Sequence, residues 1–291
     1  MSWFDAWRYP RPRAEALTAL ERAAGEARNP SSPHGAGRAA KREIDRLTET
    51  LLGALGLNPR DYELIITGSG AEAMRIALQG ARGHGHGSST ALRAANRLAI
   101  GGDVRPVALW VDENSGRRHE PVAAPMVDGT CGLGRAEVPC APHLLALCGA
   151  RSGGPPGIGA LVRRKGEPLA PLWGGGGQEH GLRSGTQAVP LAAGWCAALH
   201  APSRRDWLRD TAEELAQTLD RAGCEILVGA DARADGVVVA AVPPSVPAKL
   251  RAKDLHPAKV TVDGREALRF AVDAADKDDD IEELLRAIGT G

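Results

Sequence analysis

The residues best placed to do chemistry lie where short apolar runs end. Leu64-Ile65-Ile66-Thr67 is such a run, and Gly68-Ser69-Gly70 then turns into a helical stretch, Ala71–Leu78. A strand, a glycine turn and a helix together present backbone N–H groups to an anion. A second run, from Pro125 to Val127, leads directly into Asp128. The sequence therefore predicts an anion site at the turn and an acidic side chain at the end of a neighbouring strand.

Thiols and imidazoles are the other reactive groups. The cysteines are Cys131, Cys140, Cys148, Cys196 and Cys224. Their odd number and the absence of a C-x-x-C pair or a secretion signal indicate reduced thiols. His84 and His86 lie in a glycine-rich stretch, Arg82–Ser89, that is expected to be a loop. Two histidines without a third and fourth ligand do not make a metal centre, so we expect no metal.

Charge and hydropathy exclude several classes of partner. Lys+Arg and Asp+Glu each number 36, which leaves a formal net charge of zero. A neutral balance gives no electrostatic attraction to nucleic acid or to an anionic membrane surface. No run of about 18 apolar residues is present, so no spanning helix is expected. The first residues lack the apolar stretch of a signal peptide, and we expect a cytoplasmic protein.

Alternating helices and strands must position these residues. Ile44, Leu47, Leu51 and Leu55 recur at helical spacing and predict an amphipathic helix over Gly37–Leu55. Further strands are expected at 107–111, 144–147 and 158–162, and further helices at 14–27, 191–200 and 276–288. This alternation predicts an α/β fold with a mainly parallel sheet flanked by helices.

Four stretches carry a resemblance to a known family. They are Asn29–Gly70, Val127–Gly134 (VDGTCGLG), Leu147–Gly159 (LCGARSGGPPGIG) and Gly174–Thr186 (GGGGQEHGLRSGT). In order and relative spacing they resemble the cysteine desulfurases of the nitrogen-fixation and iron–sulfur-cluster type, a branch of the class V aminotransferases. The resemblance implies an aspartate-aminotransferase-like fold (fold type I of the pyridoxal-phosphate, PLP, transferases), here shortened. It implies a large α/β domain over residues 21–194 and a small α+β domain from residues 1–20 and 195–291.

The resemblance also implies what each site position has lost. The family's Schiff-base lysine falls on Arg151, and a guanidinium stays protonated and cannot form that imine. The phosphate-binding histidine falls on Ala150, and the loop serine before it on Cys148. In the turn, the residue after Gly70 is Ala71, where the family has threonine. Arg151 is expected to be either a solvated loop arginine or a new anion ligand.

Some family positions keep their residue type. Asp128 matches the aspartate that pairs with the pyridine nitrogen of PLP. Thr186 matches the threonine that reaches the phosphate of the other subunit, and Arg183 is retained in the same motif. Cys131 replaces the glutamine that contacts the ring oxygen. The implied cofactor-binding remnants are therefore Asp128, Thr186, Gly70, Ala71, Cys148, Ala150 and Arg183.

Three other family features are missing or displaced. No cysteine lies between Val237 and Arg269, where the family has its mobile catalytic cysteine loop. The histidine that stacks on the cofactor has no counterpart in Ser88–Leu92. Arg269 lies in the region that supplies the arginine for the substrate carboxylate. From these losses we expect a protein that is not an enzyme and has no cofactor, with PLP binding only non-covalently if at all.

Three functions follow from the resemblance. The first is a partner or regulatory subunit in sulfur mobilisation, as a homodimer or as a heterodimer with an active desulfurase paralogue. The second is an enzyme of changed chemistry in the old pocket, with Cys131 or Cys148 as a sulfur-carrying thiol. The third is a PLP-dependent cysteine desulfurase that uses a lysine from elsewhere. The lysines available are Lys41, Lys165, Lys249, Lys253, Lys259 and Lys277.

Overall fold

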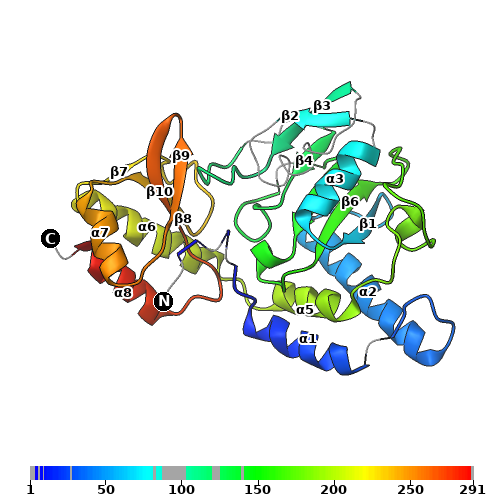
Figure 1. The fold of residues 1–291 in the computed structure, drawn as a ribbon. Coiled ribbons are helices and arrows are strands. Elements are labelled where there is room, and N and C mark those ends of the chain that lie inside the picture. Colours follow the sequence, from blue (N-terminus) through cyan, green and yellow to red (C-terminus); the bar gives the residue numbers. More distant parts are fainter. Residues whose placement is uncertain are drawn as a thin grey trace.

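A mixed sheet forms the centre of the larger of two lobes (Figure 1). The computed structural model describes residues 4–5, 7–8, 10–26, 28–80, 83–86, 103–119, 125–138 and 141–289. The described strands of this sheet are β1 (Tyr62–Thr67), β2 (Gly83–His86), β3 (Asp103–Leu109), β4 (Met126–Asp128), β5 (Leu144–Cys148) and β6 (Gly159–Arg164). Their order is β1-β6-β5-β4-β3-β2, and within this sheet β6 is the one described strand that runs opposite to the others.

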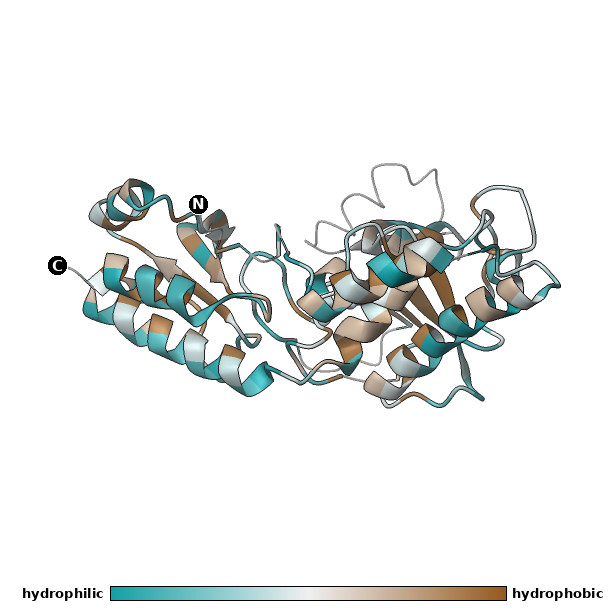
Figure 2. Cartoon of the chain, turned by 90° about the horizontal axis from the view of Figure 1, so that it is seen from below, coloured by the Kyte–Doolittle hydropathy of each residue, from teal (hydrophilic) through white to brown (hydrophobic). Residues whose placement is uncertain are grey.

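Helices cover both faces of this sheet. They are α1 (Ala14–Glu26), α2 (Gly35–Ala54), α3 (Gly70–Gly80) and α5 (Val189–His200), with short 3-10 turns η1 (Ala150–Ser152) and η2 (Glu179–Gly181). Successive strand residues point to opposite faces, so Leu64 and Ile66 pack in the core that holds α2 and α5, while Ile65 packs against α3. Burial on both faces explains the near-continuous apolar runs of the strands. Figure 2 shows these strands in brown between helices with hydrophilic outer faces.

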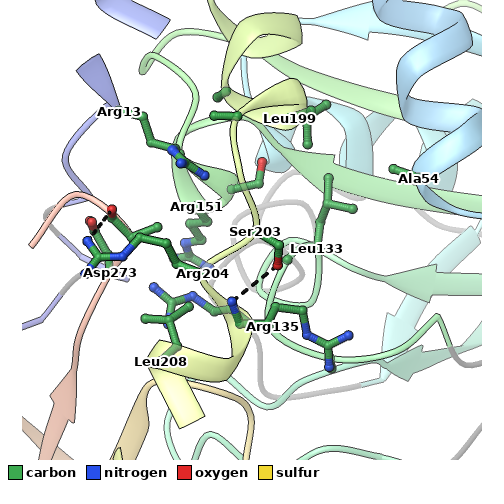
Figure 3. A pocket seen from close by; sticks show the side chains of 18 of the residues that line it. Arg13, Ala54, Leu133, Arg135, Arg151, Leu199, Ser203, Arg204, Leu208 and Asp273 are labelled. Atoms are coloured by element: carbon green, nitrogen blue, oxygen red, sulfur yellow. Dashed lines mark hydrogen bonds between the residues drawn. The ribbon is translucent and has the colours of Figure 1, made fainter. Parts of the chain in front are cut away.

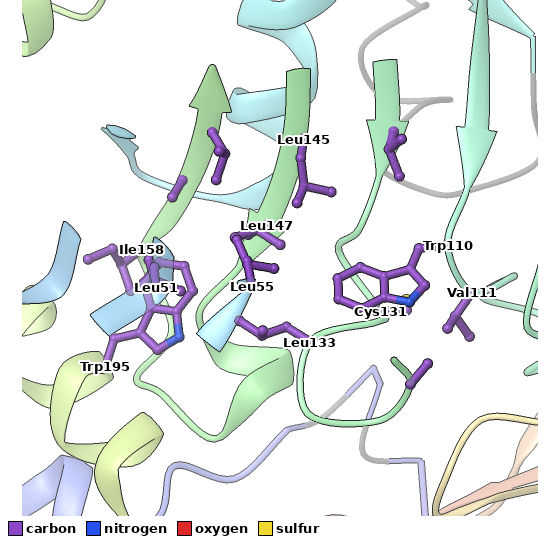
Figure 4. Close-up of a cluster of buried hydrophobic side chains, with 14 of the residues drawn as sticks. Leu51, Leu55, Trp110, Val111, Cys131, Leu133, Leu145, Leu147, Ile158 and Trp195 are labelled. Carbon is purple, nitrogen blue, oxygen red and sulfur yellow. The ribbon is translucent and has the colours of Figure 1, made fainter. Parts of the chain in front are cut away.

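The core on the α2 and α5 face extends toward the second lobe. Leu51, Leu55, Leu147 and Trp195 meet there in a single buried cluster (Figure 4). Trp110 lies in the same cluster and donates its indole N–H to the carbonyl oxygen of Glu137 at 2.6 Å. Trp110 directly follows β3, which ends at Leu109 and not at residue 111 as predicted.

The second lobe has its own sheet and core. Its strands are β7 (Glu225–Ile226), β8 (Val237–Ala241), β9 (Ala258–Val262) and β10 (Arg265–Ala271), in the antiparallel order β7-β8-β10-β9. Its helices are α6 (Arg205–Arg221), α7 (Ser245–Ala252) and α8 (Asp278–Gly289). Leu215 of α6, Phe270 of β10 and Leu284 of α8 pack together in a cluster that is separate from the cores of the larger lobe.

The first described residues bind to this second lobe. The N–H of Ala271 donates to the carbonyl oxygen of Phe4 at 2.8 Å, and Asp5 forms a parallel bridge with Ala271. Nine positions after Asp5, α1 begins and packs against α5 of the larger lobe. The segment before α1 therefore spans the two lobes. The division into residues 21–194 against 1–20 and 195–291 stays a prediction.

The α/β fold with a mainly parallel sheet is confirmed, and two local predictions are wrong. Gly83–His86 is the strand β2, paired in parallel with β3, and not a loop. Glycines without side chains do not prevent this backbone pairing, so their number misled the prediction. The helix expected from residue 276 begins at Asp278, because Asp276 accepts the N–H of Asp273 in the preceding turn. Among the described residues no helix is both long and apolar enough to cross a membrane.

Candidate functional site

Three strand ends meet at one edge of the larger sheet. β4 and β5 are parallel, and β1 runs in the same direction as β5 because both are antiparallel to β6. Their carboxyl ends therefore bring Thr67, Asp128 and Cys148 to the same edge. Ligands of open α/β sheets bind outside such ends. Two of the residues predicted from the sequence, Asp128 and Cys148, thus lie at one edge.

Asp128 is buried and held in one orientation. Its side chain is 2% exposed, and its Oδ1 accepts from the backbone N–H of Thr130 at 3.0 Å and from the Thr130 hydroxyl at 2.7 Å. The Thr130 methyl also faces the glycine turn, since a Cβ on Gly70 would lie 2.6 Å from Thr130 Cγ2 and 3.1 Å from Cys148 Cβ. The structure therefore brings Asp128, Gly70 and Cys148 together as the sequence predicted.

Part of the glycine turn is already hydrogen-bonded to Glu72. The N–H of Gly68 donates to Glu72, and the hydroxyl of Ser69 accepts from the backbone N–H of Glu72 at 3.1 Å. Glu72 in turn receives the guanidinium of Arg183 at 3.1 Å. Arg183 therefore orients the turn instead of facing a ligand. What remains for an anion are the first N–H groups of α3, those of Gly70 and Ala71.

Each nitrogen of the Arg151 guanidinium contacts a neighbouring group. Its Nη1 lies 2.7 Å from the Sγ of Cys131, and its Nη2 lies 2.7 Å from Oε1 of Glu113. Its Nε donates to the carbonyl oxygen of Trp7 at 3.1 Å. Only 15% of the side chain is exposed, so the expectation of a solvated loop arginine is wrong. Burial lowers the pKa of Arg151, but Cys131 and Glu113 raise it by more, and the group stays cationic.

The two candidate thiols differ in environment. Cys131 is 3% exposed, and burial raises its pKa to about 12 although Arg151 acts in the opposite direction. At neutral pH it is therefore a protonated thiol that accepts a hydrogen bond from a guanidinium. Cys148, at the end of β5, is half-buried. Both are free, as are Cys196 and Cys224, and Cys140 lies outside the described residues.

Two residues of this network were missed in the sequence. The guanidinium of Arg269 donates to the backbone carbonyl of Glu113 and to the carboxylate of Asp5. Glu113 therefore connects Arg151 to Arg269, and Arg269 in turn binds Asp5. Nothing near Asp5 in the sequence marks it as part of a site, because its partner is 264 positions away. Glu113 lies in none of the four stretches that carry the family resemblance.

The remaining predicted residues are dispersed. Ala150 is the first residue of η1 and offers no polar side chain. Thr186 is exposed in the loop before α5, and the glycine tract Gly174–Gly177 is exposed as well. His84 and His86 lie on β2, and Ser88–Leu92 falls outside the described residues. In the part of the chain that the structure describes, no three His, Cys, Asp or Glu side chains are grouped to hold a metal.

Comparisons with known proteins agree with this arrangement. No protein-family model matches the chain. An IscS-like cysteine desulfurase of Mycobacterium tuberculosis is 28% identical over 265 residues, covering 71% of this chain but only 65% of that relative. A solved NifS-like protein superposes with a TM-score of 0.85 at 19% identity, covering 99% of this chain and 98% of the other.

A further solved structure bears on the cofactor. It is a lysine-to-alanine C-DES variant with glycine covalently linked to its PLP cofactor, and it superposes with a TM-score of 0.74 at 17% identity over 95% of this chain and 93% of its own. Together with the desulfurase relatives, this neighbour contradicts the expectation that the chain has no cofactor, or PLP only without a covalent bond. The expectation rested on the loss of the lysine side chain at position 151 and gave too little weight to the shared fold.

Proposed function

Because the chain belongs to the cysteine desulfurase family, of the IscS and NifS type, we propose that it acts in sulfur mobilisation as a partner or regulatory subunit. In this proposal its own site does not release sulfur from cysteine. The observation that carries the proposal is the position of Arg151, whose guanidinium is bound by Cys131, Glu113 and Trp7 at the place where the family has its lysine.

The chemistry of the family needs an amine at that place. An amine that can lose its proton attacks the cofactor aldehyde and afterwards moves protons, whereas a guanidinium remains charged at any working pH. The pairing with Glu113 strengthens this charge state further. The sequence also has no cysteine between Val237 and Arg269 that could accept the sulfur. Two separate requirements of desulfuration are thus unmet.

PLP is the cofactor that we propose for the site at the edge of the sheet. Asp128, buried and oriented by Thr130, would face the pyridine nitrogen. The N–H groups of Gly70 and Ala71 would receive the phosphate, in a turn so closely packed that a Cβ on Gly70 would collide with Thr130. PLP supplies an electron sink when it is bound. Its presence does not replace the amine that Arg151 lacks.

An exposed loop supports the role as a partner. Thr186 and the glycines 174–177 are exposed, on a motif that matches the family almost residue by residue. By resemblance, Thr186 would reach the phosphate in the site of the other subunit. A chain that keeps this loop and changes its own lysine is suited to complete the site of an active paralogue in a heterodimer, or of its copy in a homodimer.

A second candidate function uses the thiols. Cys148 is half-buried at the end of β5 and could carry sulfur as a persulfide, with Arg151 and Cys131 behind it. Cys148 interacts electrostatically with Arg151, which favours this reading, since a guanidinium stabilises an anionic sulfur. The pKa of Cys131, raised to about 12 by burial, disfavours Cys131 itself as the carrier. Cys148 is therefore the thiol to test.

One reconstitution separates these functions. The purified chain is incubated with PLP and L-cysteine, and released alanine and sulfide are measured, with a known desulfurase as positive control. We expect no alanine from this chain alone. Co-expressed with a desulfurase encoded in the same genome, it should co-purify and change the rate of that enzyme. Substituting Thr186→Ala should abolish the rate change without preventing co-purification.

The opposite results are equally clear. Multiple turnovers of alanine release by the chain alone would refute the proposal. A persulfide on Cys148 after incubation with an active desulfurase, lost in Cys148→Ser, would instead establish the sulfur-carrier function.

A further inference from the structure

A separate cavity lies between the two lobes. It has a volume of about 390 Å³ and is bounded by η1, the end of α5, the start of α6 and the loop that follows β4 (Figure 3). Asp128, Gly70, Ala71 and Cys148 do not belong to its wall, whereas Ala150 and Arg151 do, so the cavity adjoins the site at the strand ends. Its volume falls within the range of small-molecule pockets.

The wall of this cavity is rich in arginine. Five arginines and two acidic residues line it among the described residues: Arg13, Arg135, Arg151, Arg204, Arg205, Glu137 and Asp273. Figure 3 shows that the labelled arginines come from several different elements, with Leu133 and Leu199 contributing apolar surface. A wall of this composition suits a ligand that has an anionic group and an apolar part.

Four of these arginines have carboxylate partners elsewhere. Arg151 lies 2.7 Å from Glu113 and Arg205 lies 2.8 Å from Asp235. Arg13 and Arg204 have looser partners, each at 3.7 Å, in Glu15 and Asp278.

Arg135 differs from the other four. It is 4% exposed, and its Nη1 donates to the backbone carbonyl of Asp235 at 3.0 Å. No carboxylate of the described residues comes within 4.0 Å of its guanidinium. The nearby Asp273 is occupied by the N–H groups of Arg11, at 3.1 Å, and of Ala275, at 2.6 Å. Burial lowers the pKa of Arg135, as expected for a cation short of a counter-charge.

A buried cation without a counter-ion is costly, and the usual remedy is a paired anion. We infer that the cavity binds a small organic phosphate, whose oxygens pair with Arg135 and whose apolar part lies against Leu133 and Leu199. Guanidinium groups bind phosphate with two parallel hydrogen bonds, and a dianion matches the surplus of arginine over acid better than a single carboxylate. Nη1 of the partly exposed Arg204 donates to the carbonyl oxygens of Ala274 and Asp276, and its Nη2, which has Asp278 only at 3.7 Å, would make the second contact.

Phenyl phosphate is a suitable probe, because it combines both features. Isothermal titration at constant ionic strength should show saturable binding to the full chain, with one site per chain. Benzoate and inorganic phosphate, which each lack one feature, should bind at least about tenfold more weakly. Arg135→Gln should weaken phenyl phosphate by at least about tenfold, and so should Arg204→Gln, while the exposed control Arg286→Gln should leave it unchanged.

Two controls protect the test. Added PLP should not change the affinity of phenyl phosphate, because PLP is proposed for the α3 turn; competition between them would place the probe there and overturn the inference. Without ligand, Arg135→Gln should be no less stable than the parent, because it removes an uncompensated charge. The inference would also be overturned if the parent chain showed no saturable binding. The same holds if Arg135→Gln and Arg204→Gln bound phenyl phosphate as well as the control Arg286→Gln does. If Arg135→Gln does not fold, the affinity of Arg204→Gln alone tests the inference.

Discussion

Asp5 and Arg269 form an ion pair in which each side chain is only 2% exposed, although 264 positions separate them in the chain. Arg269 also donates to the backbone of Glu113, whose side chain binds Arg151. Asp5 is therefore part of the interior. It occupies the guanidinium that by family resemblance would receive a substrate carboxylate, which agrees with a subunit that does not turn over cysteine.

Removing the charge of Asp5 should be strongly destabilising. Asp5→Asn leaves Arg269 buried without its counter-charge, and breaking such a pair from one side costs about 3 kcal/mol or more. Urea denaturation measures the loss. Asp206→Asn, at a residue whose side chain is 92% exposed, is the matched control and should change the free energy of unfolding by less than about 0.5 kcal/mol. Equal effects at the two positions would show that the buried pair contributes nothing.

Glu113 should be needed to hold Arg151. Glu113→Gln leaves the guanidinium, 15% exposed, with a neutral partner, and we expect a loss of about 2 kcal/mol in unfolding free energy. Arg151→Met added to Glu113→Gln should recover part of this loss, because no unpaired cation then remains. Glu282→Gln, in an exposed pair with Arg286 on α8, is the control. An additive double variant would contradict the coupling.

The thiols should react at very different rates. Cys131 is buried with a pKa of about 12, so almost none of it is thiolate at pH 8. Iodoacetamide followed by peptide mass spectrometry should label Cys148 well before Cys131 in the native protein, and both in urea. The free thiols Cys196 and Cys224, whose pKa values burial also raises, serve as internal slow references. Rapid native labelling of Cys131 would refute its assigned environment.

Glu179 should make stability fall as pH rises. Burial raises its pKa above the ordinary value of 4.5, and hydrogen bonds from Ile66 and Gln187 only partly oppose this. The folded state then holds a proton that the unfolded state has lost. Its contribution to stability is full below about pH 4.5 and is lost as pH rises through the folded pKa.

Glu179→Gln should therefore stabilise the protein at pH 8 relative to the parent and change little at pH 4. Gln187 can accept from the new amide, because its Oε1 has no partner among the described residues. Urea unfolding at both pH values measures the difference. A stability gain that is the same at both pH values would show that titration of Glu179 is not its cause.

The sequence alone was sufficient for the elements that form the core. The spacing of Ile44, Leu47 and Leu51 predicted α2, and the apolar runs before Thr67 and Asp128 predicted β1 and β4, because periodic burial leaves a local pattern. The aspartate-aminotransferase-like fold was indicated by the family resemblance and not by the spacing of apolar residues. In the same way the motifs located Asp128, Gly70 and Cys148, which the structure brings to one edge.

Long-range pairing was not predictable in this way. The contacts of Asp5 with Arg269 and of Glu113 with Arg151 join segments whose local sequence carries no periodic signal. Arg151 was identified by position, but a single sequence does not reveal that an arginine is buried until its partners are known. For the cofactor, reasoning from that one side chain led to the wrong expectation.

The bridge between Phe4–Asp5 and β10 has a consequence for synthesis of the chain. On the ribosome, residue 5 emerges long before residue 271, and joining them later costs on the order of 5 kcal/mol in chain entropy. The second lobe therefore reaches its final state only after β10 has been synthesised. Until then Phe4 and Asp5 lack the strand end against which they are buried in the folded chain.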